Sequence, residues 1–169
     1  MIGVETRTSG TKNVGDKVSR GVNKYMRDGA AKGFAVAQEN TPEDRGQLRQ
    51  SGFPPEERDG QFVWGYAGAA YAAAQEEGAD PFTPPIQPLL EWADRVFGST
   101  PISTQEVLKR VDNNEWGPDL FAHPGMAVWS KIRSEGIQPK GFMQDGADAQ
   151  RQWYKNNDVR TYIDRELER

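Results

Sequence analysis

The first regular pattern in the chain is a stripe of apolar residues that recurs every three or four positions from Val14 to Ala37. This spacing places the apolar side chains on one face of a helix. Asn13 is a suitable residue to cap the start of that helix, and Asn40-Thr41-Pro42 to end it. The sequence therefore predicts an amphipathic helix over about 14–39, preceded by a flexible, Gly/Ser/Thr-rich N-terminal arm over 1–13.

The far side of this helix carries a basic stripe at helical spacing, made of Lys17, Arg20, Lys24 and Arg27. Such a stripe is more typical of a solvated outer face than of a surface that binds phosphates, and it lacks interleaved aromatic residues that would stack on bases. Gly29 and Gly33 lie near the apolar stripe. Because glycine has no side chain, another part of the backbone could approach the helix closely at these positions.

The next pattern is the alternation typical of β-strands. The segment 61–67 places its aromatic residues on one face: Phe62, Trp64 and Tyr66. A shorter strand pattern over 47–53, anchored by Leu48, comes before it, and a turn rich in Pro, Glu, Asp and Gly over 54–60 separates the two. The sequence therefore predicts an antiparallel hairpin.

Helical segments make up the rest of the chain. Two helices are predicted over 69–77 and 85–97, and each ends at a glycine, Gly78 or Gly98. A third follows the capping box from Ser103 to Glu106, and a fourth begins at His123-Pro124 and ends at Gly136. The final helix begins at about Asp145 and is broken at Asn156-Asn157-Asp158. A long N-terminal helix, a small antiparallel sheet and several C-terminal helices define an α+β fold class. We predict a single α+β domain over 14–169 with a helical elaboration at about 99–124.

Composition and charge narrow the classes of function. The chain of 169 residues has no Cys and one His, which excludes thiolate chemistry and a metal site with several His ligands. Its net charge is -4, and residues 41–120 carry 14 acidic and 6 basic side chains. This acidic middle does not suit a dedicated DNA-binding protein. No signal peptide or membrane-spanning pattern is present, so we expect a soluble protein made in the cytoplasm, without membrane contact.

Residues that could carry catalysis are few. His123 precedes a proline at a helix start, where a capping or surface role is favoured over a Ser-His pair, and no glycine-rich phosphate loop is present. Neighbouring carboxylates such as Glu76 and Glu77 point about 100° apart on a helix and do not converge on one atom. A metal-dependent hydrolase using Asp44, Glu76 and Asp80 stays open as an alternative. We predict no cofactor and no enzymatic activity.

The order of three short motifs is more informative than any single residue. The first contains Pro42, Gly46, Leu48 and Ser51; the second contains Tyr71, Ala72, Glu76 and Gly78. The third is either Asp80-Pro81-Phe82 or the stretch from Gly136 to Met143. This order resembles the tail-completion or neck protein family of long-tailed bacterial and archaeal viruses, over about residues 14–167. The resemblance favours the second stretch, because relatives often place this motif after a helix like the one predicted at 85–97. Ala79 departs from the family pattern, in which a Thr is usual.

The resemblance implies a ring protein at the joint between the head and the tail of a virion. The ring is expected to be a homo-oligomer, with a hexamer as the first expectation, and to contact a head-closure or adaptor ring and the tail-tube or terminator proteins. Transient, non-specific proximity to genomic DNA is expected, because the ring would surround the genome channel. The N-terminal arm and the C-terminal helix would reach a neighbouring ring, and assembly would take place in the host cytoplasm.

Two sets of residues follow from this interpretation. The expected subunit-interface residues are Leu48, Ser51, Trp64, Tyr71, Glu76, Glu77, Gly78, Asp80 and Phe142. The expected channel-facing residues are Glu56, Glu57 and Asp59, because an acidic channel wall repels DNA and lets it slide. A tail assembly chaperone or a minor tail protein remains an alternative within the same setting.

Overall fold

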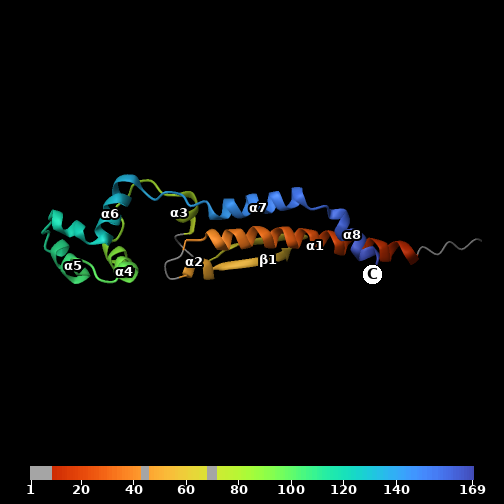
Figure 1. The fold of residues 1–169 in the computed structure, drawn as a ribbon, viewed down its shortest axis with the longest axis horizontal. Coiled ribbons are helices and arrows are strands. Elements are labelled where there is room, and N and C mark those ends of the chain that lie inside the picture. The colour runs from red at the N-terminus through yellow and green to blue at the C-terminus, as the bar shows by residue number, and fades with distance from the viewer. Residues whose placement is uncertain (1–8, 43–45, 68–71) are drawn as a thin grey trace, which may run out of the picture. The chain divides into compact units, whose positions relative to one another are not determined.

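A computed structural model of the chain describes residues 9–42, 46–67 and 72–169, and its helices and strands are drawn in Figure 1. The chain divides into two compact units. The first unit combines residues 1–69 with residues 141–169, and the second unit is the continuous stretch 70–140 between them. The elements are a long N-terminal helix, a two-stranded antiparallel sheet and several later helices, which confirms the predicted α+β class.

This division differs from the prediction of one domain with an elaboration at about 99–124. The second unit is larger than that segment because it also takes in the helices on either side. Leu90 and Met126, from those two helices, pack in a core that belongs to the second unit. The apolar faces of both helices thus bury each other, which sequence periodicity alone does not reveal.

The first unit is built on α1 (Ser9–Asn40), a helix of 32 residues. The predicted helix is confirmed, but it begins at Ser9 rather than after Asn13. No proline lies between Ser9 and Asn13, so nothing interrupts the hydrogen-bonded ladder there. Residues 9–13 of the predicted flexible arm are therefore helical, and residues 1–8 lie outside the described residues.

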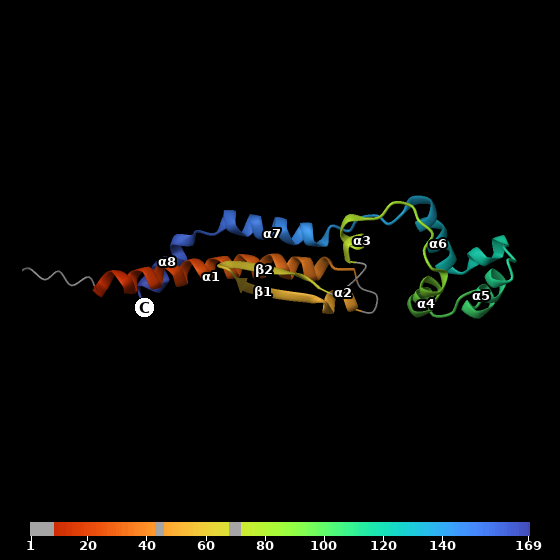
Figure 2. The same cartoon turned by 180° about the vertical axis from the view of Figure 1, so that it is seen from behind.

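Two C-terminal helices pack along α1, namely α7 (Phe142–Asn156) and α8 (Val159–Leu167). Figures 1 and 2 both show α7 running beside α1. Glycines allow this contact: a Cβ on Gly33 would lie 2.9 Å from the carbonyl oxygen of Gly146, and one on Gly21 would lie 2.7 Å from the Cα of Ile163. The close approach of another backbone, expected from the sequence, is present at Gly33.

At Gly29, by contrast, the neighbour is a side chain. A Cβ there would collide with the ring of Tyr154. The predicted break in the C-terminal helix is also present, since α7 ends at Asn156 and the Asp158 carboxylate accepts a hydrogen bond from the Arg160 N–H to start α8. However, α7 starts at Phe142 and not near Asp145, because Gly141 has a φ of 62° and bends the chain directly before it.

The hairpin consists of β1 (Gly52–Arg58) and β2 (Gln61–Tyr66), paired antiparallel as predicted. The turn is shorter than expected: Asp59 and Gly60 have φ values of 50° and 73°, typical of a two-residue hairpin loop. The register shifts by one residue between Phe53 and Glu56. This bulge falls on Pro54 and Pro55, which cannot donate hydrogen bonds to a regular ladder.

The predicted strand over 47–53 is wrong for its first half. Residues Gln47–Gln50 form a short helix, α2, directly before β1. Gly46 has a φ of 71°, which starts a tight turn, and the Ser51 hydroxyl donates to the Leu48 carbonyl and closes it. Leu48 is buried, as its hydrophobicity suggested, but it is held in a helical turn rather than a strand.

Aromatic contacts fix the hairpin on α1. The predicted aromatic face of β2 is confirmed: the guanidinium of Arg27 lies 5.6 Å from the Phe62 ring centroid, and the rings of Trp64 and Tyr66 lie 6.2 and 6.5 Å from Phe34. The Tyr66 ring also meets the edge of Phe142 at 5.0 Å. The first unit therefore has one core, shared by α1, the hairpin and α7.

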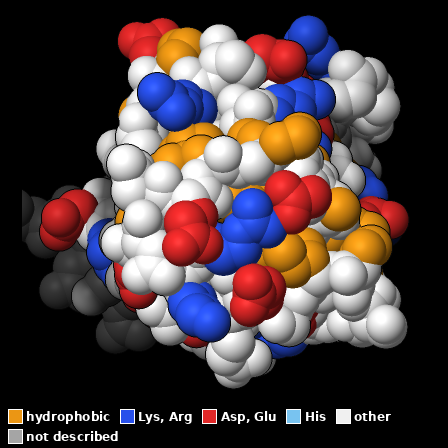
Figure 3. Space-filling model, turned by 90° about the vertical axis from the view of Figure 1, so that its left-hand side faces the viewer, with side chains coloured by type: hydrophobic (Ala, Val, Ile, Leu, Met, Phe, Trp, Pro, Cys, Tyr) orange, Lys and Arg blue, Asp and Glu red, His pale blue; other side chains and the backbone are white. Residues whose placement is uncertain are grey.

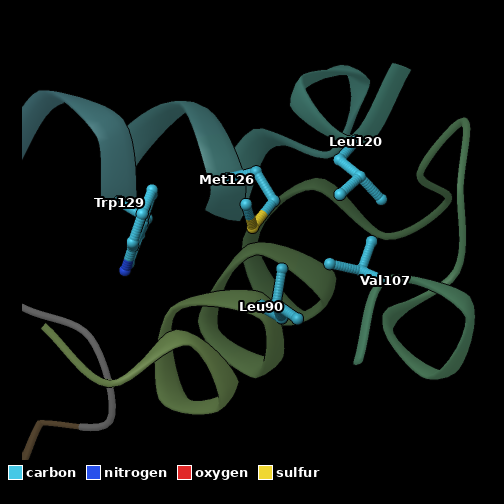
Figure 4. Packing of buried hydrophobic residues seen from close by; sticks show 5 residues of the cluster. All are labelled: Leu90, Val107, Leu120, Met126 and Trp129. Carbon is cyan, nitrogen blue, oxygen red and sulfur yellow. The ribbon is translucent and has the colours of Figure 1, made fainter. Parts of the chain in front are cut away.

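The second unit contains α3 (Ala72–Glu77), α4 (Ile86–Phe97), α5 (Thr104–Asp112), the 3-10 helix η1 (Pro118–Ala122) and α6 (Pro124–Glu135). Its core, shown in Figure 4, consists of Leu90, Val107, Leu120, Met126 and Trp129. The predicted N-cap at Ser103 is confirmed, since its hydroxyl accepts a hydrogen bond from the Glu106 N–H. All five core residues come from helices, so the core of this unit is formed by helices alone.

Candidate interaction surfaces

Two short extended stretches of the second unit, one around Ala79 and one around Ile137, pair through backbone hydrogen bonds, and we call them the paired link. Ala79 and Ile137 exchange two backbone hydrogen bonds of 2.9 and 2.8 Å, and Gln75 accepts a third from Lys140. Gly78 and Gly136 flank this pair with φ values of 80° and 77°. Geometry favours both glycines, because L side chains rarely adopt these φ values and because a Cβ at either position would collide with the opposite strand of the link.

Acidic side chains surround this link. An open recess with a volume of about 510 Å³ is lined by Glu77, Asp80 and Glu135, together with backbone and prolines of both link strands. Glu76 is half-buried and Glu77 exposed, so the two carboxylates diverge, as expected for neighbours on a helix. The recess has the chemistry of a solvated acidic surface.

The described residues contain no group of three or more His, Cys, Asp or Glu side chains placed to hold a metal ion. Of the three residues considered for a hydrolase, Asp44 lies outside the described residues, Glu76 is half-buried and Asp80 is exposed.

The residues predicted to line a channel lie at the far end of the hairpin. Glu56, Glu57 and Asp59 are all exposed there, and Arg58 forms an ion pair of 2.8 Å with Glu56. Glu56 and Glu57 are neighbours on β1, so their side chains lie on opposite faces of the hairpin, and Asp59 lies in its turn. Whether these residues face a channel stays a prediction.

Several residues predicted to contact a neighbouring subunit lie inside their own unit. Leu48 and Phe142 are buried, at 1% and 0% exposure, so their side chains are unavailable to another subunit and we no longer place them at an interface. Trp64 is half-buried and donates its indole N–H to Gln150. Ser51 is half-buried and closes the α2 turn, whereas Tyr71 lies outside the described residues.

The single histidine has a structural role. His123 is fully buried and caps α6, since its Nδ1 accepts a hydrogen bond from the Gly125 N–H at 3.1 Å. Its Nε2 lies 3.3 Å from both Asp94 and the Thr104 hydroxyl. A capping or surface role was predicted from the His-Pro pair; the cap is present, but the ring is buried rather than at the surface. The contact with Asp94 was not predicted, because it joins helices far apart in the sequence.

An apolar groove in the second unit was also missed by sequence reasoning. It has a volume of about 570 Å³ and is lined by Pro84, Pro85, Leu108, Val111, Trp116 and Trp129, among others. The Trp116 and Trp129 rings stack at 5.7 Å, and Trp129 donates its indole N–H to the Pro84 carbonyl. The groove depends on pairs of residues from different helices, which no local pattern indicates.

Exposed apolar side chains also occur elsewhere on the second unit. Val96 and Phe97 at the end of α4 are 54% and 55% exposed, and Phe97 meets the edge of the Trp92 ring. Figure 3 shows apolar side chains exposed between charged ones on one face of the molecule. Exposed aromatic groups surrounded by polar ones are typical of surfaces that contact other proteins.

A buried carboxylate joins α8 to α1. The Glu166 side chain is 6% exposed and forms ion pairs with Lys24 at 2.6 Å, Arg20 at 3.3 Å and Arg169 at 3.1 Å. These cations, led by the hydrogen bond from Lys24, hold the pKa of Glu166 below its usual value. Part of the predicted basic stripe is thus engaged within the chain rather than solvated, although Arg20 and Lys24 keep about half of their side-chain surface exposed.

Comparison of the chain with models of known protein families, with curated proteins and with solved structures finds no match. Within the described residues, no helix is both long and apolar enough to cross a membrane.

Proposed function

We propose that this protein is a structural component of the head-tail joint of a tailed virus, acting as a neck or tail-completion ring around the genome channel. In this role it is a homo-oligomer, with a hexamer as the simplest expectation, located in the virion between head and tail and assembled in the host cytoplasm. Its partners are a head-closure or adaptor ring on one side and tail-tube or terminator proteins on the other.

One observation carries the proposal: the sequence motifs behind the resemblance coincide with the bends and joints of the fold. Gly46 starts the turn before the hairpin, Gly78 and Gly136 flank the paired link, and Phe142 packs against Tyr66. Residues in these roles determine the course of the backbone and its packing, and none of these roles is catalytic. The motif order therefore supports an assembly role by analogy with the family that it resembles.

The charge distribution of the two units supports the same reading. The second unit carries 10 acidic and 6 basic side chains, whereas the first carries 15 of each, so the whole net charge of -4 falls on the second unit. Acidic surfaces repel a passing nucleic acid and do not retain it, and in the proposed role this applies to the second unit as well as to the predicted channel-facing residues Glu56, Glu57 and Asp59 of the first unit. Exposed aromatic side chains on the same unit offer contact surface for other proteins.

The position of the gene tests the class of function directly. In the proposed role the coding sequence lies between genes for capsid or portal proteins and genes for tail-tube proteins. A position among metabolic genes would contradict it. Mass spectrometry of purified particles then separates the neck role from the chaperone role, because a neck protein is present in the finished virion at a fixed copy number and a chaperone is absent.

An enzymatic role is tested by substitution. Glu76→Gln and Asp80→Asn, singly and together, remove the two described carboxylates of the hydrolase hypothesis while keeping side-chain volume. In the proposed structural role the variants still assemble into particles with a joined head and tail, as scored by electron microscopy. Loss of a metal-dependent hydrolytic activity in these variants, with assembly intact, would favour the enzyme instead.

A further inference from the structure

The hairpin of the first unit leaves a strand edge open. Among the described residues, β1 and β2 form a sheet of two strands only, so the outer edge of each has no strand partner. The two edges differ in how regular their backbone hydrogen-bonding groups are. The outer edge of β1 contains Pro54, Pro55 and the register shift between Phe53 and Glu56, whereas β2 contains no proline and no bulge. An open, regular edge is a template for another strand.

The surroundings of β2 suit an added strand. Side chains of β2 reach α7, through the hydrogen bond from Trp64 to Gln150 and the contact of Tyr66 with Phe142. The helix layer beneath the sheet therefore continues past β2, on the side of its open edge. Met143 of α7 is half-buried, and its Cε would lie 4.0 Å from a Cβ on Gly65 of β2, so α7 offers apolar surface to the side chains of one more strand.

The chain contains a segment with the pattern of such a strand. In residues 1–8, which lie outside the described residues, every even position is β-branched, namely Ile2, Val4, Thr6 and Thr8, and the odd positions include Gly3, Glu5 and Arg7. This period of two, with apolar residues at 2 and 4, is the pattern of a strand with one face on a core.

The arm cannot reach the edge of its own hairpin. Arg27 contacts Phe62, near the turn end of β2, and Arg27 lies 18 residues after Ser9 on α1. A helix rises about 1.5 Å per residue, so the turn end of β2 is about 27 Å along α1 from Ser9. Residues 2–8 span about 25 Å when fully extended, which leaves none of them to pair.

We propose that residues 2–8 of one copy of this chain add as a third strand to the open edge of β2 in a second copy. The occupant of the edge is thus the N-terminal segment of a neighbouring subunit. Arm and edge are different surfaces of the same chain, so the contact is heterologous and repeats from copy to copy until the assembly closes. As a way to form the proposed ring, the inference rests on the proposed function, but self-association through the arm can be measured independently.

The first experiment measures association of the full-length protein by native mass spectrometry and sedimentation velocity over a range of concentrations. The test variant carries Val4→Pro and Thr6→Pro, which remove two backbone donors from the arm. The matched control carries Val4→Thr and Thr6→Val, which keep the backbone donors and the β-branched side chains. We expect a closed oligomer for the wild type and the control, and association at least about tenfold weaker for the proline variant. Circular dichroism is expected to show equal helix content in all three.

The second experiment locates the contact. Because the chain contains no Cys, a Val4→Cys protein can be mixed with a Val63→Cys protein and cross-linked with a short bismaleimide without background. Val63 alternates with the α1-facing aromatics of β2, so this substitution leaves the core intact. We expect cross-linked heterodimers with Val63→Cys and none with the control Asp112→Cys, on α5.

A wild type that stays monomeric, an oligomer that the prolines leave unchanged, or equal cross-linking to both partners would overturn the strand exchange. None of these results bears on the gene-neighbour and virion tests of the proposed function. Conversely, arm-dependent association in a protein absent from virions would overturn the neck assignment alone.

Discussion

Lys24 of α1 donates a hydrogen bond of 2.6 Å to Glu166 of α8, 142 residues later in the chain. With Arg20 also contacting this carboxylate, α1 contributes two of the three cations that surround a side chain only 6% exposed. The last helix of the protein is thereby fixed to the first by charge as well as by close packing.

Stability should depend on this carboxylate at acidic pH. The pKa of Glu166 in the folded protein is lower than its unfolded value of about 4.3, so the charged form stabilises the fold above that pH. The stabilisation is lost as the pH falls through the folded pKa. We expect Glu166→Gln to lower the melting temperature at pH 7 and to flatten its decrease between about pH 5 and pH 3. Glu168→Gln, at an exposed neighbour, is the control; identical pH profiles for wild type and Glu166→Gln would contradict the prediction.

Packing of α7 on α1 should not tolerate a side chain at Gly146. A Cβ there would lie 2.6 Å from the Gly33 carbonyl oxygen and 2.7 Å from the Trp64 ring. We expect Gly146→Ala to destabilise the protein by about 1–3 kcal/mol, measured by urea unfolding. Gly15→Ala is the matched control, because nothing lies within 4 Å of its Cβ. That substitution should stabilise α1 by about 0.5–1 kcal/mol, and a similar gain at Gly146 would disprove the close contact.

Substitution of Gly136 should destabilise the protein by more than the strain of a positive φ alone, because its Cβ would also disrupt the paired link. Gly136 and Gly98 both have positive φ, at 77° and 71°, but only Gly136 faces the opposite strand of the link, where a Cβ would meet the Ala79 carbonyl. We expect Gly98→Ala to cost about 1–3 kcal/mol from backbone strain and Gly136→Ala to cost more. Hydrogen exchange at the amides of Ala79 and Ile137 reports the link itself. Faster exchange in Gly98→Ala than in Gly136→Ala would be inconsistent with this role.

The cap of α6 can be separated from the packing of the histidine ring. His123→Ala removes the acceptor for the Gly125 N–H and leaves a cavity, so we expect a loss of about 2–4 kcal/mol. His123→Asn keeps an acceptor at the position of Nδ1 and should recover part of that loss. Thermal unfolding of both variants tests the difference. Equal destabilisation would mean that the cap contributes little and that burial of the ring dominates.

The elements predicted most accurately from the sequence are those with local signals. The 3.6-residue stripe from Val14, the aromatic face of β2, the Ser103 cap and the break near Asn157 all depend on residues close together in the chain. The prediction was wrong at Leu48, where a buried residue between Gly46 and Ser51 suits a helical turn as well as a strand. Hydrophobicity indicated burial there but not the backbone conformation.

Relationships between distant segments could not be predicted. Nothing near Glu166 indicates that it lies against Lys24, and nothing near Asp94 indicates that it meets His123. The separation into two units has the same origin, because α4 and α6 carry apolar faces that could equally have packed on α1. Which apolar faces pack together depends on the tertiary structure of the whole chain, and no local sequence pattern specifies it.

The first unit contains both ends of the chain, and this has a consequence for how the protein is made. During translation α1 and the hairpin are synthesised long before Gly141, where the second part of the first unit begins. The second unit is continuous and is fully synthesised once Lys140 has been added. At about 5–20 residues per second, α1 waits several seconds for the helices that cover its glycine-lined face. The second unit can therefore reach its native state before the first, because the first needs α7 and α8 to be synthesised before they dock onto α1.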